Sequence, residues 1–159
     1  MDNSHHRNRI YDFFSRQTEL EKVQLFARND NAGESKQVLL HILNTTPKLN
    51  ELQFHANVIK FTVAEFENFM TVTSQLQSLA LEADILLDGS CPIELSSLSP
   101  SIKYTKLKKL HLRGNVDERI IFEILDRSRM SLHDLYLKSI NDAILQKILE
   151  GQVCIVTFT

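Results

Sequence analysis

The sequence contains very little of several residues that mark large classes of protein. Its 159 residues include two cysteines, four glycines, three prolines and no tryptophan. The two cysteines, Cys91 and Cys154, are too few for a disulfide framework, so we expect reduced thiols and a cytoplasmic or nuclear location. The scarcity of glycine leaves no phosphate-binding glycine loop.

Long apolar runs and a strong charge of one sign are also missing. No run of about 18 apolar residues occurs, so we expect no membrane-spanning helix. The polar residues 1–7 lack the apolar core of a secretory signal. A formal net charge of −2 gives no broad field for gripping an anionic membrane or nucleic acid, and neither partner is expected.

What the chain does contain is an apolar pattern that recurs along its length. Each copy has the form L-x-x-L-x-L, with valine or phenylalanine replacing leucine at some positions. First positions of successive copies lie 29, 27, 31, 25 and 21 residues apart, a period typical of stacked supersecondary units. The copies are Leu20, Val23 and Leu25; Leu49, Leu52 and Phe54; Leu76, Leu79 and Leu81; Leu107, Leu110 and Leu112; Leu132, Leu135 and Leu137; and Val153, Val156 and Phe158.

The segments between these copies have helical periodicity. Apolar residues at i, i+1, i+4 and i+5 mark one buried face of a helix, and Phe66, Phe69 and Met70 form a variant of this spacing. The full faces are Val38, Leu39, Ile42 and Leu43; Ile120, Ile121, Ile124 and Leu125; and Ile144, Leu145, Ile148 and Leu149.

Capping residues stand where these helices should begin. Thr62 and Glu65 have the T-x-x-E spacing of a capping box, in which each side chain binds the backbone N–H of the other residue. Asp117 and Asp142 precede two further helices, where a carboxylate accepts free backbone N–H groups and meets the positive end of the helix dipole.

The two ends of the chain depart from the repeat. Residues 1–17 are expected to form a flexible polar tail, which includes His5 and His6, and a helix that caps the first strand. Residues 153–159 read as a strand with no helix after it. We expect an uncapped edge there, explained by truncation, self-association or a partner that covers it.

The third repeat, over residues 88–104, contains Gly89, Pro92 and Pro100. Proline is tolerated at the first position of a helix. We therefore expect a short helix from Pro92 followed by a loop, with one long irregular loop as the alternative. The residues that such a helix would bury are Ile93, Leu95 and Leu98.

These patterns together resemble a leucine-rich repeat protein, whose motif is L-x-x-L-x-L-x-x-N/C-x-L. Residues 49–59 match the motif fully, with Asn57 in the asparagine position, and residues 107–115 match it as far as Asn115. The steps at residues 116–117 and 140–142 are similar to those of the ribonuclease-inhibitor-like and F-box-associated subclasses.

The resemblance implies one α/β domain over residues 1–159. Its fold would be a horseshoe solenoid of about five to six repeats, with a parallel sheet on the concave face and helices on the convex face. Arg28, Asp84 and Ile140 stand where other repeats have the asparagine. The ladder of hydrogen-bonded turns is therefore expected to be incomplete.

Side chains that alternate with the buried leucines should lie on the concave face, because successive residues of a strand point to opposite sides. Aligned strands bring these residues into rows, which also pass through Lys22, Ser78, Ala80 and Thr157. The candidate partner-binding residues are Gln24, Phe26, Glu51, Gln53, His55, Glu82, Lys109, His111, Arg113, Asp134, Tyr136 and Lys138.

Three pairs of opposite charge should lie side by side on neighbouring strands. They are Lys22 with Glu51, Lys109 with Asp134, and Glu82 with Arg113. Each exposed pair is worth about 0.2–1 kcal/mol, so they tune the charge of the surface rather than hold the fold.

Signals of catalysis are weak. None of the six histidines pairs with a carboxylate or cysteine at a metal-ligand spacing, so we expect no metal, no cofactor and no enzymatic activity. Phe26 is either a binding anchor on the concave face or packed under the N-terminal helix. A basic cluster is either solvated or a docking patch for an acidic partner; it comprises Lys103, Lys106, Lys108, Lys109 and Arg113, with Tyr104 as its one interleaved aromatic.

The function that we expect is non-enzymatic recognition of a protein partner on the concave face. Proteins that look like this often serve as substrate-recognition arms of F-box-type ubiquitin ligases, although no F-box-like segment precedes these repeats. The alternatives are an enzyme inhibitor of the ribonuclease-inhibitor kind and a fragment of a larger leucine-rich repeat receptor.

Overall fold

Helices and strands alternate along the chain, as the repeat predicts. The computed structural model describes residues 3–27, 32–89, 98–151 and 155–158. The helices are α1 (Asn3–Ser15), α2 (Ala32–Thr45), α3 (Val63–Thr73), α4 (Glu118–Ser128) and α5 (Asp142–Gly151). The strands are β1 (Lys22–Ala27), β2 (Glu51–Phe61), β3 (Ser78–Leu87), β4 (Lys109–Arg113), β5 (Asp134–Leu137) and β6 (Ile155–Phe158).

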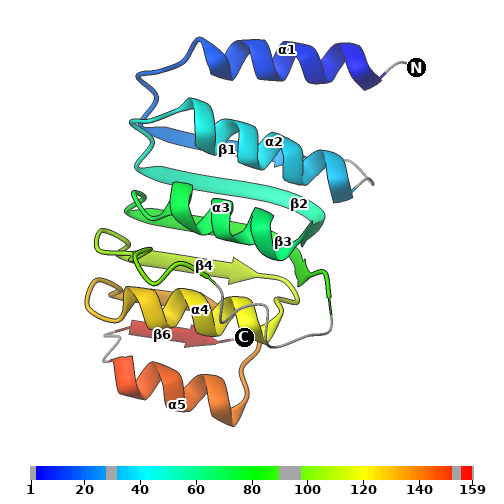
Figure 1. Cartoon of the computed structure of the whole chain (residues 1–159). Coiled ribbons are helices and arrows are strands. Elements are labelled where there is room, and N and C mark those ends of the chain that lie inside the picture. Colours follow the sequence, from blue (N-terminus) through cyan, green and yellow to red (C-terminus); the bar gives the residue numbers. More distant parts are fainter. Residues whose placement is uncertain (1–2, 28–31, 90–97, 152–154, 159) are drawn as a thin grey trace.

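The six strands form one parallel sheet in sequence order, β1-β2-β3-β4-β5-β6. Helices α2 to α5 lie along one side of this sheet, and α1 lies at its β1 end (Figure 1). We call the side of the sheet away from α2 to α5 the open face. The predicted α/β class with a parallel sheet is therefore confirmed.

The apolar triplets form the core between the sheet and the helices. All three residues of the second to fifth triplets are buried, whereas Leu20 and Leu25 of the first triplet are half-buried. The side chains of the sixth triplet lie outside the described residues. Strand alternation thus directs the leucines toward the helices and leaves the intervening side chains on the open face.

Two strands are longer than the repeat predicts. β2 and β3 continue past the expected turns, with a shift of register between His55 and Val58, and they bury a second apolar layer. That layer consists of Ile59, Phe61, Ile85 and Leu87. Asn57, in the asparagine position of the motif, is exposed and lies within the continuing strand β2 rather than in a turn.

An aspartate links β3 to the turn after the next strand. Asp84 Oδ1 accepts a hydrogen bond from the backbone N–H of Asn115 at 2.8 Å, which ties β3 to the turn after β4. In that turn Gly114 has φ +157°, and a Cβ placed on it would lie 2.0 Å from the carbonyl oxygen of Ala83. The backbones of β3 and the turn touch there, so the site accepts only glycine. Arg28 lies outside the described residues.

Most helix predictions are confirmed. Both bonds of the Thr62–Glu65 capping box are present, and Asp117 accepts from the backbone N–H of Arg119 at 3.0 Å. The prediction for Asp142 is wrong. The residue before it, Asn141, caps α5 by accepting from the Ile144 N–H at 2.9 Å, and Asp142 lies in the first helical turn.

The predicted apolar face of α5 is only half buried. Ile144 and Ile148 are in the core, whereas Leu145 is exposed and Leu149 is 71% exposed. In α4 the corresponding residues Ile121 and Leu125 are buried. The difference follows from position, because α4 packs against α5, and α5 is the last described helix in the row.

The N-terminal helix is longer than expected. α1 begins at Asn3, so the helix expected within residues 1–17 is confirmed, and the flexible tail expected at His5 and His6 is wrong. The helix is held by α2, where His41 Nε2 lies 3.0 Å from the carbonyl oxygen of Tyr11 and the two rings pack at 4.4 Å. Such tertiary packing stabilises helical turns that polar residues would not form alone.

An irregular segment replaces the helix between β3 and β4 in the described part. Residues 98–108 contain no helix, and Leu98, Ile102 and Tyr104 are buried. The guanidinium of Arg127 on α4 donates to the carbonyl oxygens of Ser99 at 2.7 Å and Ile102 at 3.0 Å. The predicted short helix at Pro92 lies outside the described residues.

Tyr104 links this segment to α3. Its hydroxyl is fully buried and lies 2.7 Å from Thr73 Oγ1, and burial raises the pKa of Tyr104 above its ordinary value of about 10. The Tyr104 hydroxyl therefore ionises more readily in the unfolded chain than in the folded one. The free energy of unfolding should fall as pH rises above 10. The prediction that Tyr104 interleaves an exposed basic cluster is wrong.

We expect Tyr104→Phe to cost about 1 kcal/mol at pH 7, because the buried hydrogen bond to Thr73 is lost. The variant should also lose less stability than the wild type as the pH is raised above 10. Urea unfolding between neutral and alkaline pH measures both effects. Parallel declines in the two proteins would show that the Tyr104 hydroxyl does not control alkaline unfolding.

Candidate functional site: the open face of the sheet

The open face carries the rows that strand alternation predicts. Backbone register aligns Gln24 with Gln53, and His111 with Ala80 and Tyr136. The same register aligns Lys22, Glu51, Ser78, Lys109 and Asp134 in one row, and Phe26, His55, Glu82 and Arg113 in another. Lys138 follows directly after β5, and its backbone N–H donates to the Leu112 carbonyl at 3.3 Å.

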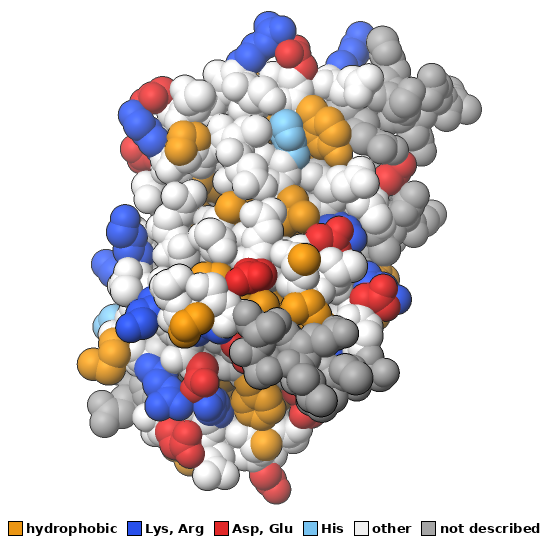
Figure 2. Space-filling view, in the orientation of Figure 1, with side chains coloured by type: hydrophobic (Ala, Val, Ile, Leu, Met, Phe, Trp, Pro, Cys, Tyr) orange, Lys and Arg blue, Asp and Glu red, His pale blue; other side chains and the backbone are white. Residues whose placement is uncertain are grey.

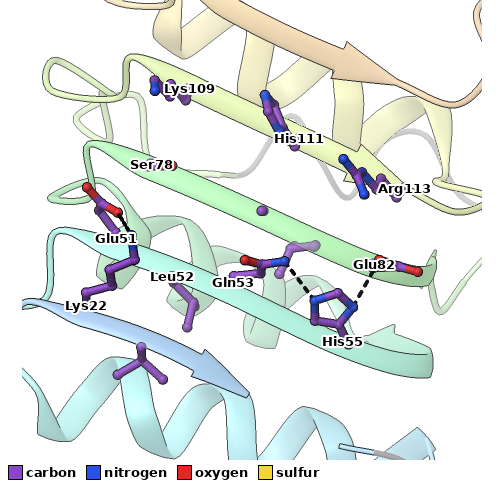
Figure 3. Close-up of a pocket in the computed structure, with 13 residues that line it drawn as sticks. Lys22, Glu51, Leu52, Gln53, His55, Ser78, Glu82, Lys109, His111 and Arg113 are labelled. Carbon is purple, nitrogen blue, oxygen red and sulfur yellow. Dashed lines mark hydrogen bonds and ion pairs between the residues drawn. The ribbon is translucent and has the colours of Figure 1, made fainter. Parts of the chain in front are cut away.

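A shallow groove of about 300 Å³ runs along the middle of this face. Its floor is β3, where the outward side chains Ser78 and Ala80 are small and Glu82 stands at one end (Figure 3). β2 forms one wall with Gln53 and His55, and β4 forms the other. The β4 wall consists of Lys109, His111 and Arg113. The sequence placed Ser78 and Ala80 in the rows, but we did not predict them as binding residues. Two small side chains on a central strand, between larger ones on both neighbours, would have indicated a hollow there.

One of the three expected charge pairs is confirmed. Lys22 Nζ lies 2.8 Å from Glu51 Oε2 across β1 and β2. Both side chains are about half exposed or more, so the pair contributes little to stability. It does neutralise this end of the β2 wall.

His55 organises the other end of the β2 wall. Its Nδ1 lies 3.0 Å from Glu82 Oε2, and its Nε2 lies 2.9 Å from Gln53 Nε2 (Figure 3). Phe26 stacks on the imidazole with the ring centroids 4.2 Å apart. The expected Glu82–Arg113 ion pair is wrong. The Glu82 carboxylate contacts the His55 imidazole on β2, on the other side of β3 from Arg113.

Phe26 is on the open face and not packed beneath the N-terminal helix. Its side chain is 55% exposed although one side of the ring covers His55. A large aromatic that is held on one face by a neighbouring ring and exposed on the other is suited to act as a binding anchor.

The charges around β4 and β5 also differ from expectation. Asp134 Oδ2 lies 3.3 Å from His111 Nε2, although the two are not aligned for a hydrogen bond, so the expected Lys109–Asp134 ion pair is wrong. The guanidinium carbon of Arg113 lies 5.1 Å from the centroid of the Tyr136 ring, a cation–π contact. The register neighbours are as predicted, but Glu82 lies beside His55 and Asp134 beside His111 instead of beside the expected cations.

Cations without a carboxylate partner gather around β4. Within the described residues, Lys109 and Arg113 on the groove wall have no carboxylate at ion-pair distance, and neither has Lys138. The same is true of Lys103, Lys106 and Lys108 in the loop before β4. Figure 2 shows basic side chains at the left margin, at the level of that loop, whereas the rest of the helix side mixes both signs.

The predicted basic cluster is therefore divided between two surfaces. Lys109 and Arg113 line the groove on the open face. Lys103 lines a separate hollow beside the end of α4, together with Arg129 and Met130. The cluster is contiguous in sequence, but strand β4 and the loop before it place its members on different surfaces.

Within the described ranges, no group of three or more histidine, cysteine, aspartate or glutamate side chains could hold a metal ion. None of the described helices has the length and apolar character needed to cross a bilayer. Cys91 and Cys154 lie outside the described residues.

Comparisons with known proteins bear on the fold. No family model and no curated protein matches the sequence. Among solved structures, the chain is similar to the C-terminal domain of tropomodulin from Caenorhabditis elegans, with a TM-score of 0.50 and 10% sequence identity over 91% of this chain and 90% of that chain. At this identity the likeness shows the fold alone, an α/β arrangement that fits a solenoid of strand–helix units.

Proposed function

We propose that the open face binds another protein. The observation that supports this most directly is the groove itself: an uncovered sheet surface with the small residues Ser78 and Ala80 on its floor and an exposed aromatic, Phe26, stacked on His55 of its wall. Apart from the core residues Val23, Leu52 and Leu81 beneath its floor, the residues that line it point away from the core. Aromatic residues are enriched in protein–protein interfaces and among the residues that contribute most to binding.

Narrower roles remain predictions. Substrate recognition for an F-box-type ubiquitin ligase, inhibition of an enzyme, and membership of a larger receptor would each use such a face. Four further expectations also remain predictions: the horseshoe curvature, the leucine-rich repeat subclass, the absence of enzymatic activity and the cytoplasmic or nuclear location. Each depends on the resemblance or composition of the sequence.

Site-specific photo-crosslinking in a cell extract tests the proposal. A benzophenone amino acid would replace Gln24 or Lys138 on the open face, and Thr71 or Met130 on the helix side; all four side chains are exposed. We expect discrete crosslinked proteins from the open-face positions only. Equal crosslinking from both sides, or from the helix side alone, would contradict an open-face binding site.

A further inference from the structure

We propose that the β4 wall of the groove binds an acidic peptide segment in an extended conformation, with carboxylates four residues apart. This inference rests on the proposed function and adds the chemistry of the partner. It depends on three features of the described residues: the distribution of unpaired charge, the spacing of two cations along one strand, and the width of the groove.

The charge of the groove is one-sided. On the β2 side of the groove Lys22 pairs with Glu51, and the carboxylate of Glu82, at one end of the β3 floor, contacts the His55 imidazole. On the β4 wall Lys109 and Arg113 have no carboxylate partner among the described residues. An unmatched cation beside a low-dielectric floor attracts an anion more strongly than a solvated one does. The ligand should therefore supply the missing carboxylates.

The spacing of these cations specifies where the carboxylates should stand. Lys109 and Arg113 are four residues apart on one strand, and both side chains point to the open face. At about 3.3 Å per residue the two positions are roughly 13 Å apart. An extended peptide lying along β3 has the same rise, so acidic residues at positions k and k+4 would face Lys109 and Arg113 together.

Arg113 is already held in place for such a contact. Its guanidinium lies over the Tyr136 ring, which orients the planar group without using its N–H donors. A carboxylate can then accept two of those N–H groups at once. Holding the side chain before binding lowers the entropy lost on binding.

The groove is too narrow for a helix. Strands β2 and β4 flank β3, so their backbones are roughly 10 Å apart, and their side chains narrow the space further. A helix with its side chains is about 10–12 Å across. It would also need residues about nine positions apart to span the distance between the two cations, at 1.5 Å per residue. An extended chain fits both the width and the spacing.

Three fluorescein-labelled peptides of nine residues test the inference by fluorescence anisotropy. All share a serine–threonine background: one has glutamate at positions three and seven, one has glutamate at positions three and four, and one has glutamine at three and seven. At about 50 mM salt, where screening is weak, we expect the first to bind at least tenfold more tightly than the other two.

Matched variants of the protein locate the site. Lys109→Gln and Arg113→Gln should each weaken binding of the first peptide about fivefold or more, which is the loss of a charge-assisted contact. Lys103→Gln removes an equally unpaired cation that does not line the groove and should leave binding unchanged. Circular dichroism and thermal unfolding would establish that all three variants fold. An equal loss in Lys103→Gln, or no loss in the groove variants, would overturn the proposal.

The outcomes separate this inference from the function on which it rests. If the glutamate peptides bind no better than the glutamine peptide while open-face crosslinks still form, the acidic chemistry is wrong and open-face binding stands. If the two glutamate peptides bind equally, the extended, four-residue geometry is wrong. If no crosslink forms from any open-face position, the proposed function itself fails.

Discussion

Leu110→Asp is expected to remove the native fold at room temperature. The Leu110 side chain is 0% exposed, at the centre of β4 between two neighbouring strands. The change removes about 2–3 kcal/mol of apolar burial and adds the cost of an unpaired buried carboxylate, several kcal/mol more. Domains of this size have about 5–15 kcal/mol of stability in total. Urea unfolding followed by circular dichroism measures the loss.

Lys109→Asp is the matched control. It places the same carboxylate one residue earlier, on the open face, where the side chain is exposed. We expect it to cost no more than about 1 kcal/mol, through repulsion from Asp134 on the neighbouring strand. Equal stability of the two variants, or greater damage from Lys109→Asp, would contradict the assigned directions of the β4 side chains.

Gly114→Ala is expected to cost on the order of 3 kcal/mol or more. A Cβ at this position would lie 2.0 Å from the Ala83 carbonyl oxygen and 2.5 Å from its carbonyl carbon. Both atoms belong to the backbone of β3, so no side-chain rotation can relieve the overlap. Either the turn or the strand must move, and thermal and urea unfolding would report the loss.

Asn115→Ala distinguishes this steric effect from the asparagine ladder of the repeat motif. The backbone N–H and carbonyl of Asn115 bond to Asp84 and Ile85, and an alanine keeps both groups. Its side chain is exposed, so we expect a change within about 0.5 kcal/mol. A loss from Asn115→Ala as large as that from Gly114→Ala would mean that the asparagine side chain holds the turn after all.

The periodic parts of the structure could be predicted because burial imposes them. Leu107, Leu110 and Leu112 must share one face of a strand, and this requirement fixes the directions of the residues between them. The sheet order and the rows of the open face follow once such units are stacked in parallel. The helical period also predicted the buried faces of α2 and α4, in which all four apolar residues are buried.

Prediction failed where a residue had two possible neighbours. Glu82 lies between His55 and Arg113 in register, and Asp134 has both Lys109 and His111 within reach. Exposed charge pairs differ by less than about 1 kcal/mol, so sequence cannot choose between such partners. The stacking of Phe26 on His55 decides one case, and this contact becomes visible only when the strands are in place.

The motif did not predict that β2 continues past Asn57. Its position fits the ladder asparagine, but the apolar residues after it, Ile59 and Phe61, are buried and continue the strand. Burial of two large side chains outweighs one turn hydrogen bond. At α5 the helix period was right, but the amount of burial also depends on a neighbouring helix, which the sequence of α5 alone does not show.

The most direct test of the account is the crosslinking yield from the two sides of the sheet, measured in one extract with the four benzophenone variants. If the open face is the binding surface, the same partner band should form from Gln24 and Lys138, and none from Thr71 and Met130. Excess acidic peptide with glutamates four residues apart should reduce the Lys138 yield. Partner bands from Thr71 and Met130 with none from Gln24 and Lys138 would place recognition on the helices and contradict the account.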